Sequence, residues 1–392
     1  MDSTGNKTTF WAASSALAAT FIASATPIPL YGTYQRVDGI SYLGLSLSSV
    51  IYFVGAVTAL LIFGRLSNHF GRKPISLITV LLAALASSLF LDVHTVTPLL
   101  IGRLFQGLSC GLASTALAAW IVDCATTVPK WVAPAVISCG PMTGLTIGGI
   151  VSGLLVEYSA LPRQLPFYLV LALLLICIFT LIKSQETVRH TSGLIHSLLP
   201  RFTLPKTAKR AYPIAAITFV CTWSLGGFFQ AFGPAMAAEQ LHSTNAVAAA
   251  LVFASIMAPS VVGASLASKM TPKSAQYYGM LSFTVFVFAI WLSLYAGILT
   301  AFLISSVLAG IAQGLVLTGS IQTMVGQLKA EQRANVLSVI YATSYTGAAI
   351  PTLIAGRLSE NVGLLGTASG YVGLAFIGAV AVICHTRSPI KA

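Results

Sequence analysis

The sequence predicts an all-α polytopic membrane protein with twelve transmembrane helices in two six-helix bundles. The 392-residue chain is 56% hydrophobic, and only 8% of its residues are charged. Soluble domains carry about 25% charged residues. Apolar runs of about 20 residues recur from Trp11 to His385, and each is long enough to cross a ~30 Å hydrocarbon core.

The apolar runs define the predicted spans in order. We place them at 11–34, 41–63, 74–92, 97–123, 131–157, 164–183, 211–237, 243–267, 275–295, 298–325, 332–358 and 365–385. The opening MDSTGNKTTF lacks the basic segment and the cleavage site of a signal peptide, so we expect the first run to remain as a span.

The basic residues set the predicted orientation. With the N-terminus inside, 17 of the 21 Lys and Arg residues lie on the inner side, and Arg103 falls within a span. The other three, Arg36, Arg163 and Arg357, lie on the outer side. This bias predicts that both termini are cytoplasmic. The same bias indicates that the net charge of +12 reflects the topology and contact with anionic lipid headgroups rather than binding of nucleic acid.

The longest polar interval divides the chain into two halves. We predict an N-terminal bundle at 1–183, a cytoplasmic linker at 184–210 with a short interfacial helix at LIHSLL, and a C-terminal bundle at 211–392. Gln106-Gly107-Leu108 in span four recurs as Gln313-Gly314-Leu315 in span ten. Duplicated halves of this kind are typical of secondary transporters.

The predicted loop between spans two and three reads GRLSNHFGRKP. It resembles the signature of the major facilitator superfamily, G-x-x-x-D-R-x-G-R-R-P, and the matching residues are Gly64, Gly71, Arg72, Lys73 and Pro74. Asn68 stands where the family usually has Asp, and His69 where it usually has Arg or Lys. The resemblance implies a gating latch, weakened by the missing charge at Asn68. The alternative is an ordinary basic inner loop.

Span four contains a second resemblance, in RLFQG. Arg103, Gln106 and Cys110 share one helical face. An arginine within a span costs at least about 2.5–3.5 kcal/mol on insertion scales. It therefore either faces a polar cavity or snorkels to the outer headgroups. The superfamily pattern implies a cavity residue for substrate anchoring or proton transfer.

Asp123 ends span four. Many superfamily members carry an acidic residue there that pairs with the loop arginine, which would be Arg72. A solvated carboxylate at the helix end is the alternative.

Span five reads CGPMTGLTIGG, and it is similar to the G-P-x-x-G-G pattern of the antiporter branch, with Leu145 in place of the second glycine. Gly140, Pro141 and Gly144 are expected to kink the helix and to permit close packing. In the superfamily this pattern is associated with exporters, so the resemblance favours efflux over uptake.

The nine acidic residues all fall in predicted loops or span ends. A buried counter-charge for a dication is therefore missing, and only Asp123 and Glu157 remain as proton-coupling candidates. By resemblance, the substrate cavity is lined by residues from both halves: Arg103, Gln106, Tyr31, Trp223, Gln230, Gln313, Gln322, Tyr341 and Tyr345. The aromatic members have packing or a membrane-interface position as their alternative role.

The combined patterns predict a secondary exporter of a small neutral, zwitterionic or anionic amphiphile, coupled to protons. An uptake carrier, an uncoupled facilitator and a receptor with a transporter fold remain alternatives. Motifs of membrane enzymes and of primary pumps are absent from the sequence. We expect no cofactor and no metal site, a monomer in the lipid bilayer, and a location in the bacterial cytoplasmic membrane.

Overall fold

The computed structural model describes residues 3–129, 132–188, 204–326, 328 and 330–387. The chain divides into two compact units. The first contains residues 1–40 and 51–200, and the second contains residues 41–50 and 201–392. Residues 41–50, the start of the predicted second span, thus group with the second unit, whereas the predicted N-terminal bundle included them. The predicted interfacial helix in the linker lies outside the described residues.

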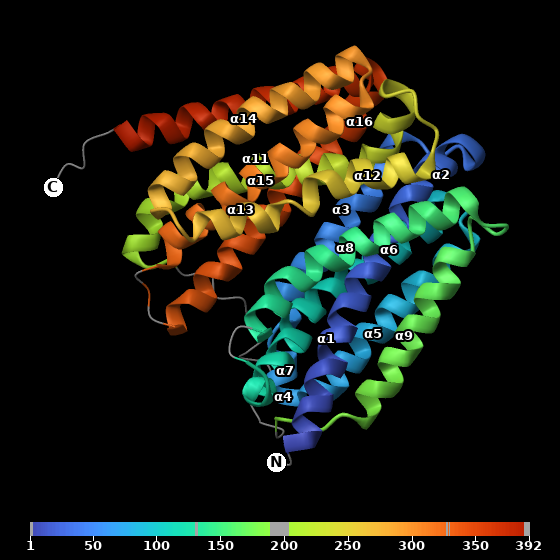
Figure 1. The fold of residues 1–392 in the computed structure, drawn as a ribbon, viewed down its shortest axis with the longest axis vertical. Coiled ribbons are helices and arrows are strands. Elements are labelled where there is room, and N and C mark those ends of the chain that lie inside the picture. The colour runs from blue at the N-terminus through green and yellow to red at the C-terminus, as the bar shows by residue number, and fades with distance from the viewer. Residues whose placement is uncertain (1–2, 130–131, 189–203, 327, 329, 388–392) are drawn as a thin grey trace. The chain divides into compact units, whose positions relative to one another are not determined.

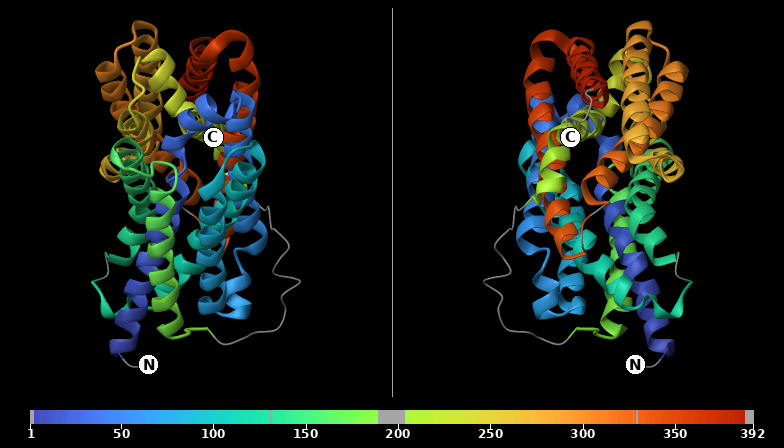
Figure 2. Two further views of the ribbon diagram at one scale, coloured as in Figure 1. Left: turned by 90° about the vertical axis from the view of Figure 1, so that its right-hand side faces the viewer. Right: turned by 90° about the vertical axis from the view of Figure 1, so that its left-hand side faces the viewer.

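The first unit is built from antiparallel helices. They are α1 (Ser3–Ala25), α2 (Tyr31–Asp38), the part of α3 (Tyr42–Thr58) from residue 51 onward, α4 (Leu66–Phe70), α5 (Arg72–Leu89), α6 (Val96–Leu112), α7 (Ala118–Asp123), α8 (Val132–Tyr158) and α9 (Leu165–Lys183). Figure 2 shows α1 and α9 running lengthwise in this unit, and α1 packs against α8, α9 and α6. Central α1 therefore contacts most of the helices that carry the candidate site.

The second unit follows the same plan with longer elements. They are α11 (Lys206–Ala235), α12 (Ala246–Met257), α13 (Ser260–Ala267), α14 (Pro272–Ala296), α15 (Leu299–Val325) and α16 (Ala330–Arg387). In Figure 1, α14 lies along this unit, where it packs against α15 and α16. Every regular element in the described ranges is helical.

The number of spans agrees with the predicted twelve. Eleven helical segments of the described chain are long and apolar enough to cross a membrane, and the last of them runs over 50 residues, Val336–His385. Gly363 interrupts that segment with φ 71° and ψ 174°, so it contains two helices. This break lies between the predicted spans eleven and twelve.

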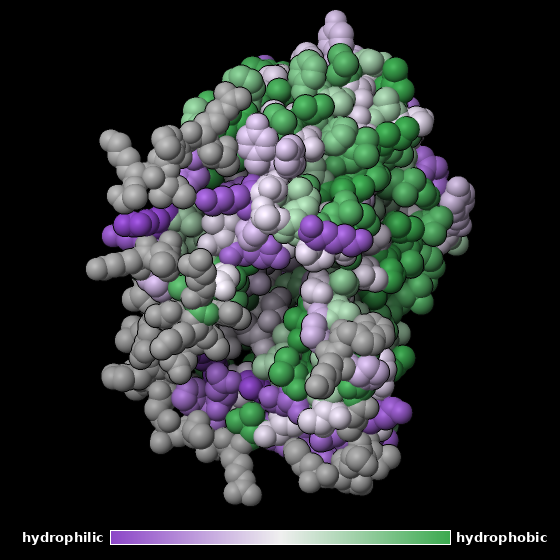
Figure 3. Space-filling view, turned by 60° about the vertical axis from the view of Figure 1, so that its left-hand side comes forward, coloured by the Kyte–Doolittle hydropathy of each residue, from purple (hydrophilic) through white to green (hydrophobic). Residues whose placement is uncertain are grey.

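The helices expose apolar side chains, as helices in lipid must. Leu175, Ile176 and Phe179 on α9 are each more than half exposed. Figure 3 shows a broad hydrophobic surface, with the hydrophilic residues gathered in separate patches. A soluble fold would bury such residues, so the surface identifies a chain whose solvent is the bilayer.

The repeated Gln-Gly-Leu stretches occupy equivalent places in the two units. A Cβ at Gly107 would overlap the carbonyl oxygen of Tyr52 on α3, and a Cβ at Gly314 would overlap that of Ser260 on α13. In each unit the glycine thus lets the fourth span touch the backbone of the second. Small residues permit this approach in membrane helices, and the correspondence is the one that a duplicated six-span unit implies.

Candidate functional site

The first span is broken by two prolines. Helix α1 ends at Ala25, a 3-10 turn covers Ile28–Leu30, and α2 restarts at Tyr31. Proline has no backbone N–H, so Pro27 cannot donate to the carbonyl of Ala23. A carbonyl that loses its helical donor within a membrane span must find another one, because lipid offers none.

Span four supplies these donors through Arg103 and Gln106. Gln106 Nε2 donates to the carbonyl of Ala23 at 2.7 Å, and Arg103 Nη1 donates to that of Ser24 at 2.9 Å. Arg103 Nη1 also donates to Gln106 Oε1 at 2.8 Å. The two side chains thus donate hydrogen bonds to carbonyl groups at the C-terminal end of α1. The sequence predicts that they share one polar face of span four.

Arg103 is completely buried, with 0% of its surface exposed. Its guanidinium carbon lies 4.4 Å from the centre of the Tyr52 ring, within range of a cation–π interaction. Two donors, Nε and Nη2, have no hydrogen-bond partner in the part of the chain that the structure describes. The snorkelling alternative is therefore wrong, and a buried cation remains with unused donors.

Two further side chains extend this polar cluster along α1. Cys110 lies one turn beyond Gln106 on α6, with Sγ 4.0 Å from the carbonyl oxygen of Thr20. Ser152 on α8 donates from Oγ to the carbonyl of Thr26 at 2.6 Å. Ser152 was not foreseen, although it lies two helical turns after Gly144 on one face.

The glycines of span five explain how α8 comes so close to α1. A Cβ at Gly144 would lie 2.8 Å from the carbonyl oxygen of Ala18, so a larger residue would push the helices apart. Gly140 has only a side-chain atom of Leu17 nearby, at 3.6 Å. Pro141 lies within the continuous helix α8. The close contact therefore depends on Gly144, and on Gly148, whose added Cβ would overlap the carbonyl oxygen of Ile22, rather than on Gly140.

The candidate residues of the second unit differ in their burial and in their contacts. Gln230 and Gln313 are buried, and each has a side-chain amide atom without a partner among the described residues. The rings of Trp223 and Tyr345 meet edge to face, with 4.8 Å between their centres.

Three other predicted cavity residues differ in their exposure and surroundings. Tyr341 is 40% exposed, whereas Tyr31 in the first unit is fully buried. Gln322 lies at the far end of α15, on a separate cavity beside Arg210 and Lys273.

The loop that carries the family signature is a compact turn. Gly64 follows a π-helical stretch, Ala59–Phe63, and α4 and α5 then flank Gly71. Gly71 has φ 101° and ψ 156°, a backbone conformation that is essentially restricted to glycine. His69 is half-buried on α4.

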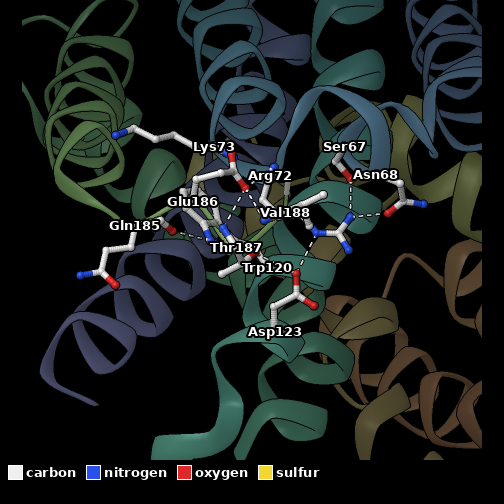
Figure 4. Close-up of polar contacts among 10 residues, drawn as sticks. All are labelled: Ser67, Asn68, Arg72, Lys73, Trp120, Asp123, Gln185, Glu186, Thr187 and Val188. Carbon is white, nitrogen blue, oxygen red and sulfur yellow. Dashed lines mark hydrogen bonds and ion pairs between the residues drawn. The ribbon is translucent and has the colours of Figure 1, made fainter. Parts of the chain in front are cut away.

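Arg72 is the centre of the contacts in this loop. Its Nε lies 2.9 Å from Asp123 Oδ2, and its Nη1 donates to Asn68 Oδ1 at 2.6 Å and to Ser67 Oγ at 2.8 Å (Figure 4). The structure thus brings together Arg72, Asp123 and Asn68. Asn68 accepts a hydrogen bond but adds no charge.

Glu186 completes the loop from the start of the linker. Its Oε1 accepts from the backbone N–H of Arg72, and its Oε2 from that of Lys73, both at 2.9 Å (Figure 4). A carboxylate at a helix N-terminus satisfies unpaired N–H groups and complements the helix dipole. Sequence reasoning missed this cap, because Glu186 lies 114 residues from Arg72.

Two other acidic residues, Asp38 and Glu239, form side-chain contacts that the sequence did not predict. Asp38, whose side chain is only 4% exposed, accepts from Arg163 at 2.8 Å and lies 3.0 Å from His94 Nδ1. In the second unit, Tyr42 donates to the carboxylate of Glu239. The proton-coupling candidate Glu157 is exposed at the end of α8, and no cluster of three metal-ligand side chains occurs among the described residues.

Sequence comparison places these features in a known group. The family model of the Major Facilitator Superfamily matches residues 9–350. The multidrug resistance protein MdtL of Klebsiella pneumoniae is 34% identical over 73 residues, 19% of each chain. Multidrug resistance protein 1 of Bacillus subtilis is 32% identical over 154 residues, 38% of this chain and 39% of its own length. The chain therefore matches less than half of either relative.

Solved transporter structures share the fold over the whole chain. The bacterial homologue of the human lysosomal transporter Spinster, in an inward-facing and unoccupied conformation, superposes with a TM-score of 0.77 at 14% identity, over 99% of this chain and 98% of its own. The nucleoside transporter NupG gives 0.73 at 12% identity, over 96% and 99%. At these identities the likeness concerns the fold.

Proposed function

Since the chain belongs to the Major Facilitator Superfamily of transporters, we propose that it exports a small amphiphilic molecule in exchange for protons. The observation that carries this proposal is the buried guanidinium of Arg103, with two unused donors beside the broken first span. Alternating access would expose this cluster to substrate, and the bacterial cytoplasmic membrane is the proposed location.

Arg103 is suited to anchor an oxygen acceptor of the substrate. A buried donor without a partner costs about 1–3 kcal/mol, so a carbonyl, carboxylate or sulfonate oxygen that reached Nε or Nη2 would relieve that cost. No carboxylate lies near the centre of any predicted span, and Arg103 forms no salt bridge among the described residues. We therefore expect neutral, zwitterionic or anionic substrates rather than dications.

Two observations support export. Two sequence relatives, MdtL and multidrug resistance protein 1, are named as multidrug resistance proteins, and span five carries the small-residue pattern that packs α8 onto α1 at Gly144. Asp123 and Glu157 are the proposed proton carriers. The Arg72, Asn68 and Asp123 contacts would serve as a gating latch, joined by the Glu186 cap. An uptake carrier or an uncoupled facilitator is the second candidate, because the cores of the spans lack a carboxylate.

Reconstituted proteoliposomes with a trapped pH dye test this function. A substrate gradient is imposed with a panel of amphiphilic drugs, organic anions and metabolites, for the wild type, Arg103→Ala and Arg36→Ala. Arg36 is an exposed arginine outside the cluster, so its variant serves as the matched control. Proton movement opposite to substrate flux in the wild type and in Arg36→Ala, and no transport in folded Arg103→Ala, is the expected result.

Two results would contradict the proposal. Substrate flux without a proton signal would favour the facilitator, and wild-type transport by Arg103→Ala would remove the anchoring role.

A further inference from the structure

A cavity of about 660 Å³ with several basic and polar side chains in its lining lies at one end of the second unit. Four helices meet there: α11 and α14 begin at this end, and α15 and α16 finish there. The volume falls within the range of small-molecule sites, about 300–1,000 Å³. The side chains that decide its character are Arg210, Lys273, His385, Gln322, Thr271 and Thr323.

The charge of this cavity is entirely positive among its lining residues. Arg210 and Lys273 contribute cations, and neither forms an ion pair with a described side chain. The described carboxylates of this unit are engaged elsewhere, Glu239 with Tyr42 and Glu360 with Arg357. Two helices begin and two end at the cavity, so their dipoles oppose one another. The side chains therefore set the sign.

The depth of the cavity is that of lipid headgroups. Its lining includes the first residues of the segments Ala208–Gln240 and Pro272–Ala296 and the last residues of Leu299–Val325 and Val336–His385. Ala211 and Met324 add apolar surface to the wall. The cavity thus offers cations where the apolar spans meet water, together with a hydrophobic side.

We infer that this cavity binds the phosphate group of an anionic phospholipid headgroup, held by Arg210 and Lys273. Guanidinium and ammonium groups are the usual protein partners of phosphate, and basic pockets between transmembrane helices suit such headgroups. Thr271, Thr323 and Gln322 can hydrogen-bond the glycerol or headgroup hydroxyls. This inference requires a membrane protein but is independent of the substrate and of the direction of transport.

Native mass spectrometry of the purified protein tests the site. Phosphatidylglycerol, cardiolipin, zwitterionic phosphatidylethanolamine, and inorganic phosphate as the soluble source are titrated separately. The variant R210Q/K273Q removes both cations from the cavity. The variant K209Q/K269Q removes the same charge from two exposed lysines that do not line it, and R210K/K273R keeps the charge and so controls for misfolding.

The expected result is selective retention of the anionic lipids by the wild type. R210Q/K273Q should bind them roughly 25-fold more weakly, since each basic residue near a headgroup contributes about a fivefold factor. K209Q/K269Q and R210K/K273R should bind nearly as the wild type does.

Three results would overturn the inference. Phosphatidylethanolamine could bind as tightly as the anionic lipids, or both glutamine variants could lose binding equally. Retention of inorganic phosphate without anionic lipid would instead assign the cavity to a soluble phosphate compound.

Discussion

Gln106 donates a hydrogen bond to the carbonyl oxygen of Ala23, 83 residues earlier in the chain, at 2.7 Å. In an unbroken helix this carbonyl would accept from residue 27, which is a proline and has no N–H. The Q-G pattern of span four and the prolines of span one are therefore two parts of one arrangement. It keeps the first span broken between α1 and α2 while leaving that carbonyl satisfied.

A double-mutant cycle tests this arrangement. Gln106→Leu should lower the free energy of unfolding by about 1–3 kcal/mol, because it strands the Ala23 carbonyl and removes an acceptor of Arg103. In the background of Pro27→Ala, which restores an N–H at position 27, the same substitution should cost less. Thermal unfolding in detergent measures the coupling energy between the two substitutions. We expect about 0.5–3 kcal/mol, as is usual for residues in contact.

Pro29→Ala is the matched control for this cycle. It restores a donor for the carbonyl of Ala25 rather than for that of Ala23, so its effect should add to that of Gln106→Leu. Additive effects for Pro27→Ala as well would show that the Gln106 hydrogen bond is not tied to the proline.

The apolar runs predicted most of the fold, because membrane helices must be about 20 apolar residues long. The break at Gly363 falls between the last two predicted spans. The sequence also indicated that Arg103 and Gln106 share a face. The carbonyl groups that accept their hydrogen bonds could not be predicted, because every residue has a backbone carbonyl and the sequence singles out none of them. Ala23 could have been identified only by noting that a proline at position 27 deprives the carbonyl four residues earlier of its helical donor.

Long-range partners at the ends of the helices were beyond reach for another reason. Glu186 caps α5 from 114 residues away, and Asp38 pairs with Arg163 across 125 residues. Each of these residues looked like an ordinary charge near a span end. The chain has only nine acidic residues, so looking for a basic or helix-terminal partner for each of them could have found these contacts.

Gly71 makes the turn of the signature loop possible. Its φ of 101° is unfavourable for any other residue, and a Cβ there would lie 2.5 Å from Glu186 Oε2. Gly71→Ala should therefore cost about 1–3 kcal/mol of stability through backbone strain, and more where the Glu186 cap is displaced. Thermal unfolding together with proteoliposome transport measures both effects.

Gly370→Ala is the control for that substitution. Its added Cβ meets no atom within 4 Å, in a helix of ordinary backbone geometry. It should leave stability unchanged or slightly higher, as alanine favours helix. Equal stability of Gly71→Ala and Gly370→Ala would show that the loop tolerates the substitution.

Arg163 neutralises a nearly buried carboxylate. The Asp38 side chain is 4% exposed, and the Arg163 side chain is 21% exposed. Arg163→Gln would remove the permanently charged partner of Asp38 and leave its contact with His94, so we expect a loss of up to about 3 kcal/mol in the free energy of unfolding. Arg36→Gln removes the same charge from an exposed position near the same helix end and should change stability by less than about 0.5 kcal/mol.

The double variant Asp38→Asn/Arg163→Gln completes this test. Removing both charges should recover part of the stability, since the isolated carboxylate is what makes the single variant costly. A double variant less stable than Arg163→Gln would contradict the ion-pair account. Thermal unfolding at low and high salt measures it, and the buried pair should respond weakly to salt.

Cys124, directly after the Arg72 partner Asp123, reports on the closure of the signature loop. The thiol is fully buried, and burial, followed by the Asp123 carboxylate, raises the pKa of Cys124 to about 11. Only the thiolate reacts with maleimide, and at pH 8 its fraction is on the order of one in a thousand. In single-cysteine variants, Cys124 should therefore label slowly at pH 8 and faster as the pH approaches 11, whereas the exposed Cys384 should label readily.

Asp123→Asn removes a negative charge, lowers the pKa of Cys124 and frees Arg72, so labelling should accelerate at constant pH. Labelling of Cys124 as fast as Cys384 at neutral pH, with both reacting fully in denaturant, would show that the loop is open.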